Sequence, residues 1–342
     1  MFVRIYLVLT TCLSLYASEI VTVANNTPTE VSVQEEWELY RFNLYFENDL
    51  FSITDSQYSS GEKFNFIFRV DNPQSSFYDL LILDYGNEDV YMSFSLANQI
   101  YTPEDLSKTG LIAEDRPYTG WTYAEMGLHK SSNTHLRALY LQVGFIGPYS
   151  KSEEIQKTIH EITDSEPPMG WSNQLNNELG INLRYIHKWR FQPDTFYGIG
   201  TSFIPFVEGD LGNVSIQASA GAHMRIGWNI PQDFGVTSLD TGGEVGIPIK
   251  NGYKEMLNRN WSFSLNFNGA GSFVAHDITL DGNTFSSSHS VEKNNFVGYL
   301  GYGFSLRYRH FILEYIKNIN SKKFKQEKKA HAVGTAVASW VF

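Results

Sequence analysis

Cysteine and long apolar runs are the features that this 342-residue sequence has least of. Its single cysteine, Cys12, lies in an apolar N-terminal stretch, so the remainder of the chain needs no disulfide. After that stretch, no segment approaches the roughly 20 apolar residues that a membrane-spanning helix requires. Strands can still cross a membrane in such a chain, because their outward apolar and inward polar positions cancel in any hydropathy average.

Positive charge is also scarce. The 26 Lys and Arg residues are outnumbered by 37 Asp and Glu residues, which gives a net charge of −11 and argues against a nucleic-acid partner. Aromatic residues are abundant instead, with 24 Phe, 20 Tyr and 7 Trp. An acidic, aromatic-rich chain of this kind is compatible with an outer-membrane β-barrel that has a polar lumen and carboxylates able to bind a metal.

The N-terminus has the organisation of a secretory signal peptide. Arg4 precedes an apolar run from Ile5 to Leu15, and the small residue Ala17 follows. We expect cleavage after residue 17, a polar periplasmic lead-in over 18–37, and a barrel over 38–342. A lipoprotein signal at Cys12 is the poorer alternative, because Thr11 is not the small residue that usually precedes a lipidated cysteine.

Alternation of apolar and polar residues is the dominant pattern after residue 38, and successive strand residues point to opposite faces of a sheet. In the segment 41–47, for example, Phe42, Leu44 and Phe46 alternate with polar residues. Twelve such segments are predicted, near 38–49, 59–70, 88–100, 118–129, 134–147, 181–192, 195–206, 215–229, 258–276, 293–306, 309–319 and 329–342.

Energetic cost decides which face of each predicted strand meets lipid. Arg or Lys at the bilayer midplane costs roughly 2–4 kcal/mol, so Lys63, Arg69 and Arg307 should point into a lumen and the phenylalanines outward. A secreted β-sandwich also alternates, but it would not tolerate so large an apolar surface in water. The C-terminal Phe342, in register with Trp340, resembles the terminal signal of outer-membrane barrels. The sequence therefore predicts an all-β fold, a transmembrane antiparallel barrel of about 12 strands.

Two long connections interrupt the predicted strands, at 101–117 and 148–180. Long loops of this kind are often functional. The second has helical character: Ser150 and Glu153 have capping-box spacing, and Ile155, Ile159 and Ile162 form an apolar stripe that leaves His160 on the polar side. We therefore expect a short helix in this loop.

Strand parity gathers several polar residues at one rim. With the N-terminus in the periplasm, the loops after the first, third and fifth strands are extracellular. Asn48, Asp49, Ser59, Lys108, His160 and Glu166 all lie in or beside these loops. Each has an ordinary structural interpretation, as a turn, loop or solvated surface residue. Together they offer oxygen ligands for a hard cation and one imidazole that can act as a base, whereas the residues do not have zinc spacing.

The residues also resemble a known family, the outer-membrane lipid A 3′-O-deacylases (LpxR-like), over essentially the whole mature chain. The resemblance is densest at 46–51 with 58–61, 99–103, 115–121, 146–148, Gln156 with His160, and 170–174. It implies a twelve-stranded barrel with its site at the extracellular-leaflet side of the bacterial outer membrane, in a chain expected to be monomeric. Asn48, Asp49, Ser59, Lys108, His160 and Glu166 match the family's functional positions.

The resemblance implies calcium-dependent hydrolysis of an acyl ester on lipid A of lipopolysaccharide. Asp49, Glu166 and oxygens around Ser59 would bind Ca²⁺, and His160 would activate water. Asn48 would position water or hold the oxyanion, and Lys108 would hold a phosphate or the oxyanion. Two alternatives stay open: a phospholipase-type acyl hydrolase using a serine such as Ser59, and a non-enzymatic porin or adhesin.

Overall fold

The structure, a computed structural model, describes residues 34–48, 57–81, 87–192, 197–243, 246–252 and 260–342. The chain divides into two units, residues 1–34 and 35–342. The predicted signal peptide and most of the predicted lead-in, and also Asp49, lie outside the described residues.

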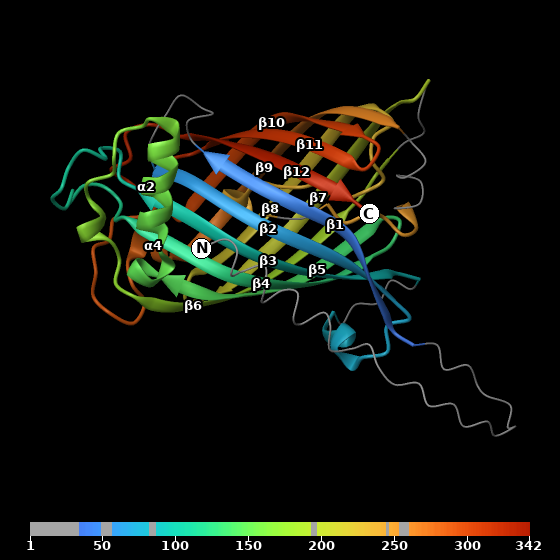
Figure 1. The fold of residues 1–342 in the computed structure, drawn as a ribbon, viewed down its shortest axis with the longest axis horizontal. Coiled ribbons are helices and arrows are strands. Elements are labelled where there is room, and N and C mark those ends of the chain that lie inside the picture. Colours follow the sequence, from blue (N-terminus) through green and yellow to red (C-terminus); the bar gives the residue numbers. More distant parts are fainter. Residues whose placement is uncertain (1–33, 49–56, 82–86, 193–196, 244–245, 253–259) are drawn as a thin grey trace, which may run out of the picture. The chain divides into compact units, whose positions relative to one another are not determined.

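The second unit is a closed antiparallel barrel, which confirms the predicted fold class (Figure 1). Every strand pairs with its sequence neighbour, and β1 pairs with β12 to close the barrel. Twelve strands are present within the described ranges: β1 (Glu36–Asn48), β2 (Gln57–Asp71), β3 (Asp89–Thr102), β4 (Thr119–Ser131), β5 (His135–Ile146), β6 (Glu178–Trp189), β7 (Ile199–Gly212), β8 (Ser215–Trp228), β9 (Trp261–Asp277), β10 (Phe296–Tyr308), β11 (Phe311–Asn320) and β12 (Ala332–Val341).

Helical pieces are short in the described part of the chain. They are α2 (Ser152–Thr163), α4 (Ile278–Asp281) and the 3₁₀ turns η2 (Ser76–Leu80), η3 (Gly147–Ser150), η4 (Trp171–Asn173) and η5 (Leu239–Thr241). None of these combines the length and apolar character that a membrane-crossing helix would need. The helix predicted in the second long loop is therefore confirmed as α2.

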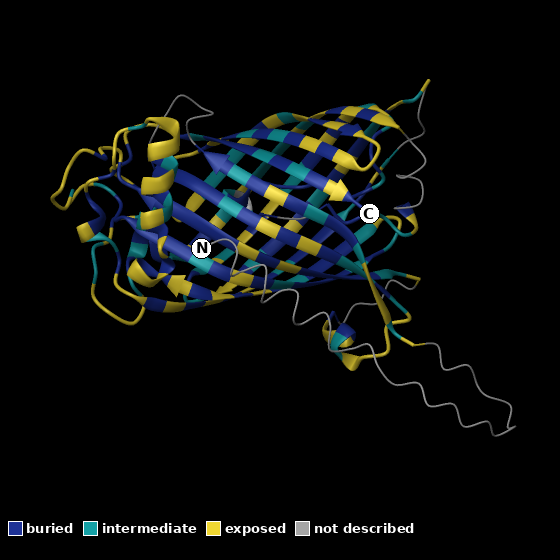
Figure 2. Ribbon diagram, viewed as in Figure 1, coloured by how far each residue is buried: buried dark blue, intermediate teal, exposed yellow. Residues whose placement is uncertain are grey.

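The wall alternates between an apolar outer face and a polar inner face, which Figure 2 shows as a chequered pattern of burial. Phe64 and Phe66 of β2 are 48% and 43% exposed, whereas Lys63, the residue before Phe64, is fully buried. Inside the barrel the Nζ atom of Lys63 lies 2.6 Å from a carboxylate oxygen of Glu125. The predicted inward direction of Lys63 and Arg307 is thus confirmed, because a cation on the outer face would lose such a partner and meet lipid.

The described part of the connection between β8 and β9 folds back into the lumen, which the alternation pattern did not predict. Its apolar residues Phe234 and Ile247 are fully buried against Tyr40 and Ile67 of the wall. Inward-facing charged side chains of the wall bind its backbone. Lys63 donates to Gly243 O (2.8 Å), Arg41 to Gly246 O (3.2 Å) and Lys188 to Phe234 O (3.2 Å). Glu47 accepts from Leu239 N (2.5 Å) and Asp240 N (3.1 Å). We call residues 230–243 and 246–248 the plug.

The plug predicts that the barrel does not conduct ions, because peptide groups and apolar side chains occupy the lumen where a porin has water. In planar bilayers the wild-type protein should give no stable conductance steps. Replacement of residues 233–248 by a short Gly-Ser linker should produce them. Steady porin-like conductance from the wild-type protein would contradict this assignment.

The connections after β3, β5 and β9 all lie at one end of the barrel, and α2 crosses the strands there (Figure 1). We call this end the α2 rim. The C-terminus lies at the opposite end. Asn48, Ser59, Lys108, His160 and Glu166 therefore share one rim, as strand parity predicts.

Candidate active site

Helix α2 packs against the outer face of β3 and β4 at the α2 rim. Gly120 of β4 makes this approach possible, because a Cβ atom at that position would lie 2.2 Å from the Cβ and Oγ atoms of Ser152. The side chain of Asn98 in β3 donates from Nδ2 to Ser152 Oγ at 2.7 Å. The first turn of α2 is thereby held on the side of the wall that faces away from the lumen.

The buried face of α2 is mainly polar, which corrects the sequence interpretation. Ser152, Gln156 and His160, spaced four residues apart, are buried, whereas Ile162 of the predicted apolar stripe is 79% exposed. The wall beneath these residues is itself polar, with Asn98 and Thr122 at its surface. Only Ile155 of the stripe packs against a buried apolar cluster, which includes Ile100 of β3 and Trp171. His160 is thus only 8% exposed rather than solvated.

The predicted capping box does not form at the start of α2. The N-cap residue is Lys151, in the left-handed conformation and without a side-chain capping bond. Ser150 instead donates its hydroxyl to Gly147 O at 2.6 Å, within the 3₁₀ turn η3 that precedes the helix. The helix begins one residue later than the capping-box spacing implies, because the chain must first turn away from β5.

His160 is oriented by the backbone of the loop that follows α2. Its Nδ1 atom lies 2.5 Å from Glu166 O, and Ser165 N donates to His160 O at 2.9 Å. A carbonyl oxygen only accepts, so Nδ1 carries the proton and Nε2 of the neutral ring holds a lone pair. The six-residue spacing between His160 and Glu166 therefore serves a backbone contact, while the Glu166 side chain is exposed.

Gln156 lies one helical turn before His160 on the same buried face. Trp171 donates from Nε1 to Gln156 Oε1 at 2.8 Å, which fixes the orientation of the amide. The Nε2 group of Gln156 is then buried without a hydrogen-bond partner in the described structure. Unused donors of this kind are uncommon, and here one lies beside a candidate base. The sequence motif included Gln156, but its pattern did not assign a role to it.

Asn48 and Ser59 come from the rim ends of β1 and β2. Asn48 is 6% exposed and pairs with Ser60, on the same outer side of the wall as Phe46 and Leu44. The register between β2 and β3 shifts between Tyr58 and Ser60, so that Ser59 occupies a bulge. Bulges re-aim side chains near functional sites. Ser59 Oγ lies 2.5 Å from Thr102 Oγ1.

Lys108 belongs to the loop that connects β3 with β4, and this loop packs against the loop after α2. Met169 N donates to Leu106 O at 2.8 Å, and the Asn173 side chain donates to Thr109 O at 2.8 Å. The Lys108 side chain itself is exposed, with Nζ 3.9 Å from Asp105. Hydrogen bonds from Ser107 hold the pKa of Asp105 below its usual value, and Lys108 adds to this effect. Lys108 is thus at the same rim but directed to solvent.

A groove runs beside α2, lined by Lys157, His160, Asp164, Met169 and Trp171. His160 therefore borders a cavity that is open at the protein surface. The described residues contain no group of three His, Cys, Asp or Glu side chains that could hold a metal ion, although Asp49 lies outside them. Oxygen atoms suited to a hard cation are nevertheless close to Asn48: Ser60 Oγ and Asn98 Oδ1 are buried and have no hydrogen-bond partner. The donor set of this region fits Ca²⁺.

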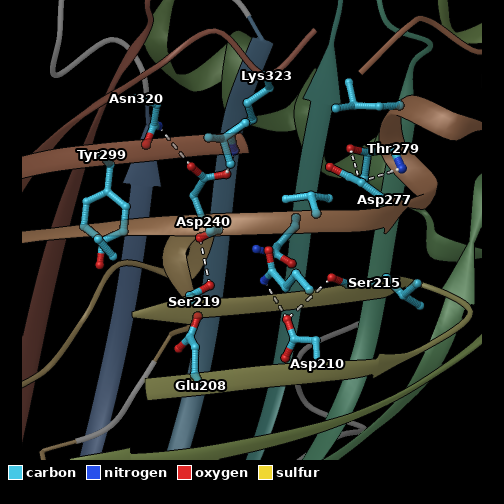
Figure 3. Close-up of a pocket in the computed structure, with 18 of the residues that line it drawn as sticks. Glu208, Asp210, Ser215, Ser219, Asp240, Asp277, Thr279, Tyr299, Asn320 and Lys323 are labelled. Atoms are coloured by element: carbon cyan, nitrogen blue, oxygen red, sulfur yellow. Dashed lines mark hydrogen bonds and ion pairs between the residues drawn. The ribbon is translucent and has the colours of Figure 1, made fainter. Parts of the chain in front are cut away.

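A second cavity, of about 140 Å³, lies inside the barrel, where Leu239 and Asp240 of the plug form part of its lining (Figure 3). Charged residues line it in pairs: Arg184 Nε lies 2.6 Å from Asp210 and Lys323 Nζ lies 2.7 Å from Asp240. The wall of the closed barrel separates this cavity from the lipid around the protein. A lipid chain in the membrane would reach the groove at α2 and not the lumen.

Fold and site together define a membrane β-barrel with its candidate catalytic groups on the outside of the wall. A family model described as "Outer membrane protein LpxR" matches residues 7–342. The chain belongs to this family and is an outer-membrane protein.

Solved structures support the fold. LpxR from Salmonella typhimurium is 17% identical, covers 88% of this chain with 100% of its own length, and superimposes with a TM-score of 0.72. The β domain of the Bordetella autotransporter BrkA is 8% identical, with coverage of 90% of this chain and 98% of its own, and has a TM-score of only 0.40. None of the curated proteins matches the sequence.

Proposed function

We propose that this protein is a calcium-dependent lipid A 3′-O-deacylase, active as a monomer at the extracellular leaflet of the outer membrane. Family membership supports an acyl ester hydrolase that acts on lipid A. The observation that carries the mechanism is the position of His160: its Nδ1–H is bound by Glu166 O, and it borders a groove on the outer side of the barrel wall. We place the α2 rim at the outer leaflet, which presents lipid A, and a groove outside the wall suits such a substrate.

His160 acts as the general base. A water molecule attacks the carbonyl carbon of the 3′ ester and gives its proton to His160 Nε2, while the contact with Glu166 O stabilises the imidazolium. The tetrahedral intermediate then collapses, the carbon–oxygen bond to the sugar breaks, and His160 returns the proton to the departing 3′ oxygen. The products are a fatty acid and a free 3′-hydroxyl group.

Two amides are placed to stabilise the intermediate. The free Nε2–H₂ group of Gln156 donates to the oxyanion, and Asn48 positions the water or shares that task. Lys108, exposed at the same rim, contacts a phosphate of the substrate. Asp49, Glu166 and the Ser59 region would hold Ca²⁺, which supplies additional positive charge at the ester carbonyl when bound.

The phospholipase-type alternative depends on a serine nucleophile. The hydroxyl of Ser59 is engaged by Thr102 and no hydrogen bond joins it to His160, so a water nucleophile is favoured. The porin alternative is disfavoured by the plug, whose residues Phe234 and Ile247 pack across the lumen.

Substitution of Gln156 by Ala should lower the kcat for lipid A deacylation by about 10²-fold, as loss of an oxyanion donor does elsewhere. The KM should change little, because the donor is used in the transition state. Because Gln156 also accepts from Trp171, Gln156→Glu is the better-matched variant: it retains an acceptor for the indole and removes the donor. Both rates are measured by release of fatty acid from purified lipid A. Full activity of Gln156→Glu would remove Gln156 from the mechanism.

Calcium removal tests the metal requirement. Purified protein in excess EGTA should lose acyl release, and Ca²⁺ added above the chelator should restore it, because the site residues are hard oxygen donors. Heat-modified gel migration of the same samples reports whether the barrel stays folded. Undiminished hydrolysis in the chelator would refute calcium dependence while leaving the deacylase assignment in place.

A further inference from the structure

Four buried oxygen atoms without a donor lie together on the outer wall beside Asn48. They are Ser60 Oγ, Asn98 Oδ1 and both carboxylate oxygens of Glu62, and none has a hydrogen-bond partner within the described residues. Glu62 pairs directly with Asn98 across β2 and β3, and Ser60 precedes it by two residues on the same face. Directly opposed side chains have Cβ atoms about 4.5–5.5 Å apart. We call Ser60, Glu62 and Asn98 the acceptor cluster.

The orientation of the Asn98 amide is determined by its neighbours. Thr122 Oγ1 donates its only proton to Ser150 O at 2.6 Å, so it must accept from Asn98 Nδ2, which lies 2.6 Å away. Asn98 Nδ2 also donates to Ser152 Oγ at 2.7 Å. Both protons of the amide are thus used, one by Thr122 of β4 and one by Ser152 of α2. The carbonyl oxygen Oδ1 is therefore left as an acceptor.

Glu62 differs from the buried carboxylates of the lumen. Those have cationic partners, such as Lys63 for Glu125 and Arg184 for Asp210. In the described structure, Glu62 lies on the outer face of β2 and forms no ion pair. The Ser60 hydroxyl lies close enough to contact the carboxylate, but the contact does not have the geometry of a normal hydrogen bond. A buried carboxylate without a partner is costly, so a ligand that supplies positive charge would stabilise this arrangement.

We propose that the acceptor cluster forms part of a divalent-cation site and that Glu62 is a ligand of the cation. A carboxylate, an amide oxygen and a hydroxyl are ligands that Ca²⁺ takes in shells of six to eight oxygens. Pairing of Ser60 with Asn48 places the cluster next to the rim end of β1, where Asp49 follows. The inference rests on the proposed calcium-dependent function and adds a ligand that the sequence motifs did not indicate.

Calcium binding measured without substrate tests this directly. Full-length protein in detergent, freed of metal with a chelator, is titrated with CaCl₂ by isothermal calorimetry. Glu62→Gln, which has nearly the same shape, should weaken Ca²⁺ binding by about tenfold or more, because ligand charge sets calcium affinity. Glu62→Asp should bind more tightly than Glu62→Gln. Glu154→Gln is the matched control: it removes an exposed carboxylate from α2 and should bind calcium as the wild type does.

Deacylation assays on the same samples separate this inference from the proposed function. With Glu62→Gln, the Ca²⁺ concentration that gives half-maximal lipid A hydrolysis should rise by the same factor as the Kd, and high Ca²⁺ should restore most of the rate. Unchanged calcium affinity in a folded Glu62→Gln variant would overturn the inference, and a higher KM for lipid A in that variant would show that the cluster binds donors of the substrate instead. Wild-type protein that binds calcium but leaves lipid A intact would refute the proposed function alone.

Discussion

His160→Ala should reduce release of acyl chains from lipid A by about 10²–10⁴-fold, the range typical for loss of a general base. The imidazole borders the groove beside α2 and its Nδ1–H is bound by Glu166 O, so Nε2 is the atom that can accept a proton from water. The substitution removes that atom from a helix on the outside of the barrel and leaves the wall unchanged. Heat-modified gel migration should therefore match the wild type.

Ile162→Ala provides the control for this experiment. Ile162 lies two residues further along α2 and is 79% exposed, so its truncation should leave both the fold and the activity as they are. An active His160→Ala variant would remove His160 from the mechanism. Loss of activity in Ile162→Ala to the same extent would mean that α2 tolerates no change, and that the histidine has no special role.

Gly120→Val should abolish deacylation without unfolding the barrel. Even the Cβ atom of the new side chain would lie 2.2 Å from the Ser152 Cβ atom, so the start of α2 must move away from β4. Catalytic groups misplaced by about 1 Å can lose about 10²-fold in rate, and a displaced helix moves Gln156 and His160 together. The expected activity is below a hundredth of that of the wild type, measured as fatty acid released.

Gly271→Val is the matched substitution on another part of the wall. Gly271 lies in β9, and a Cβ atom there would meet nothing within 4 Å, so the variant should keep full activity. Comparable activity of Gly120→Val and wild type would show that the close packing of α2 on β4 is not required. The site would then have to be formed by the β1–β2 end alone.

The strands could be predicted from sequence because each has its own period-two pattern. Trp261, Phe263, Leu265 and Phe267 of β9 are all exposed on the outer face, while Ser262 and Ser264 between them are buried. Strand parity alone then places Asn48, Lys108 and His160 at one rim. These inferences depend only on local alternation and on the antiparallel order of neighbours, which is why they transfer to the structure. The largest error is in β7, which spans Ile199–Gly212 rather than 195–206.

The plug and the face of α2 could not be predicted, because neither follows from a local pattern. Phe234 and Ile247 become buried only because the lumen surrounds them, and the connection that contains them does not alternate. The isoleucines of α2 suggested an apolar contact face, but the wall opposite the helix presents Asn98 and Thr122. The residues that face α2 belong to strands distant from it in the sequence, so the pattern of the helix alone does not reveal them. For the same reason, the acceptor cluster with Glu62 was visible only once β2 and β3 were paired.

Mass spectrometry of lipid A tests the central claim most directly. Lipid A extracted from cells that express the wild-type protein, incubated with Ca²⁺, should lose the mass of the 3′-linked acyl group. Cells that express His160→Ala at the same level should retain it. An identical lipid A spectrum with and without the wild-type protein, under conditions in which the folded barrel is present in the outer membrane, would contradict the assignment as a deacylase.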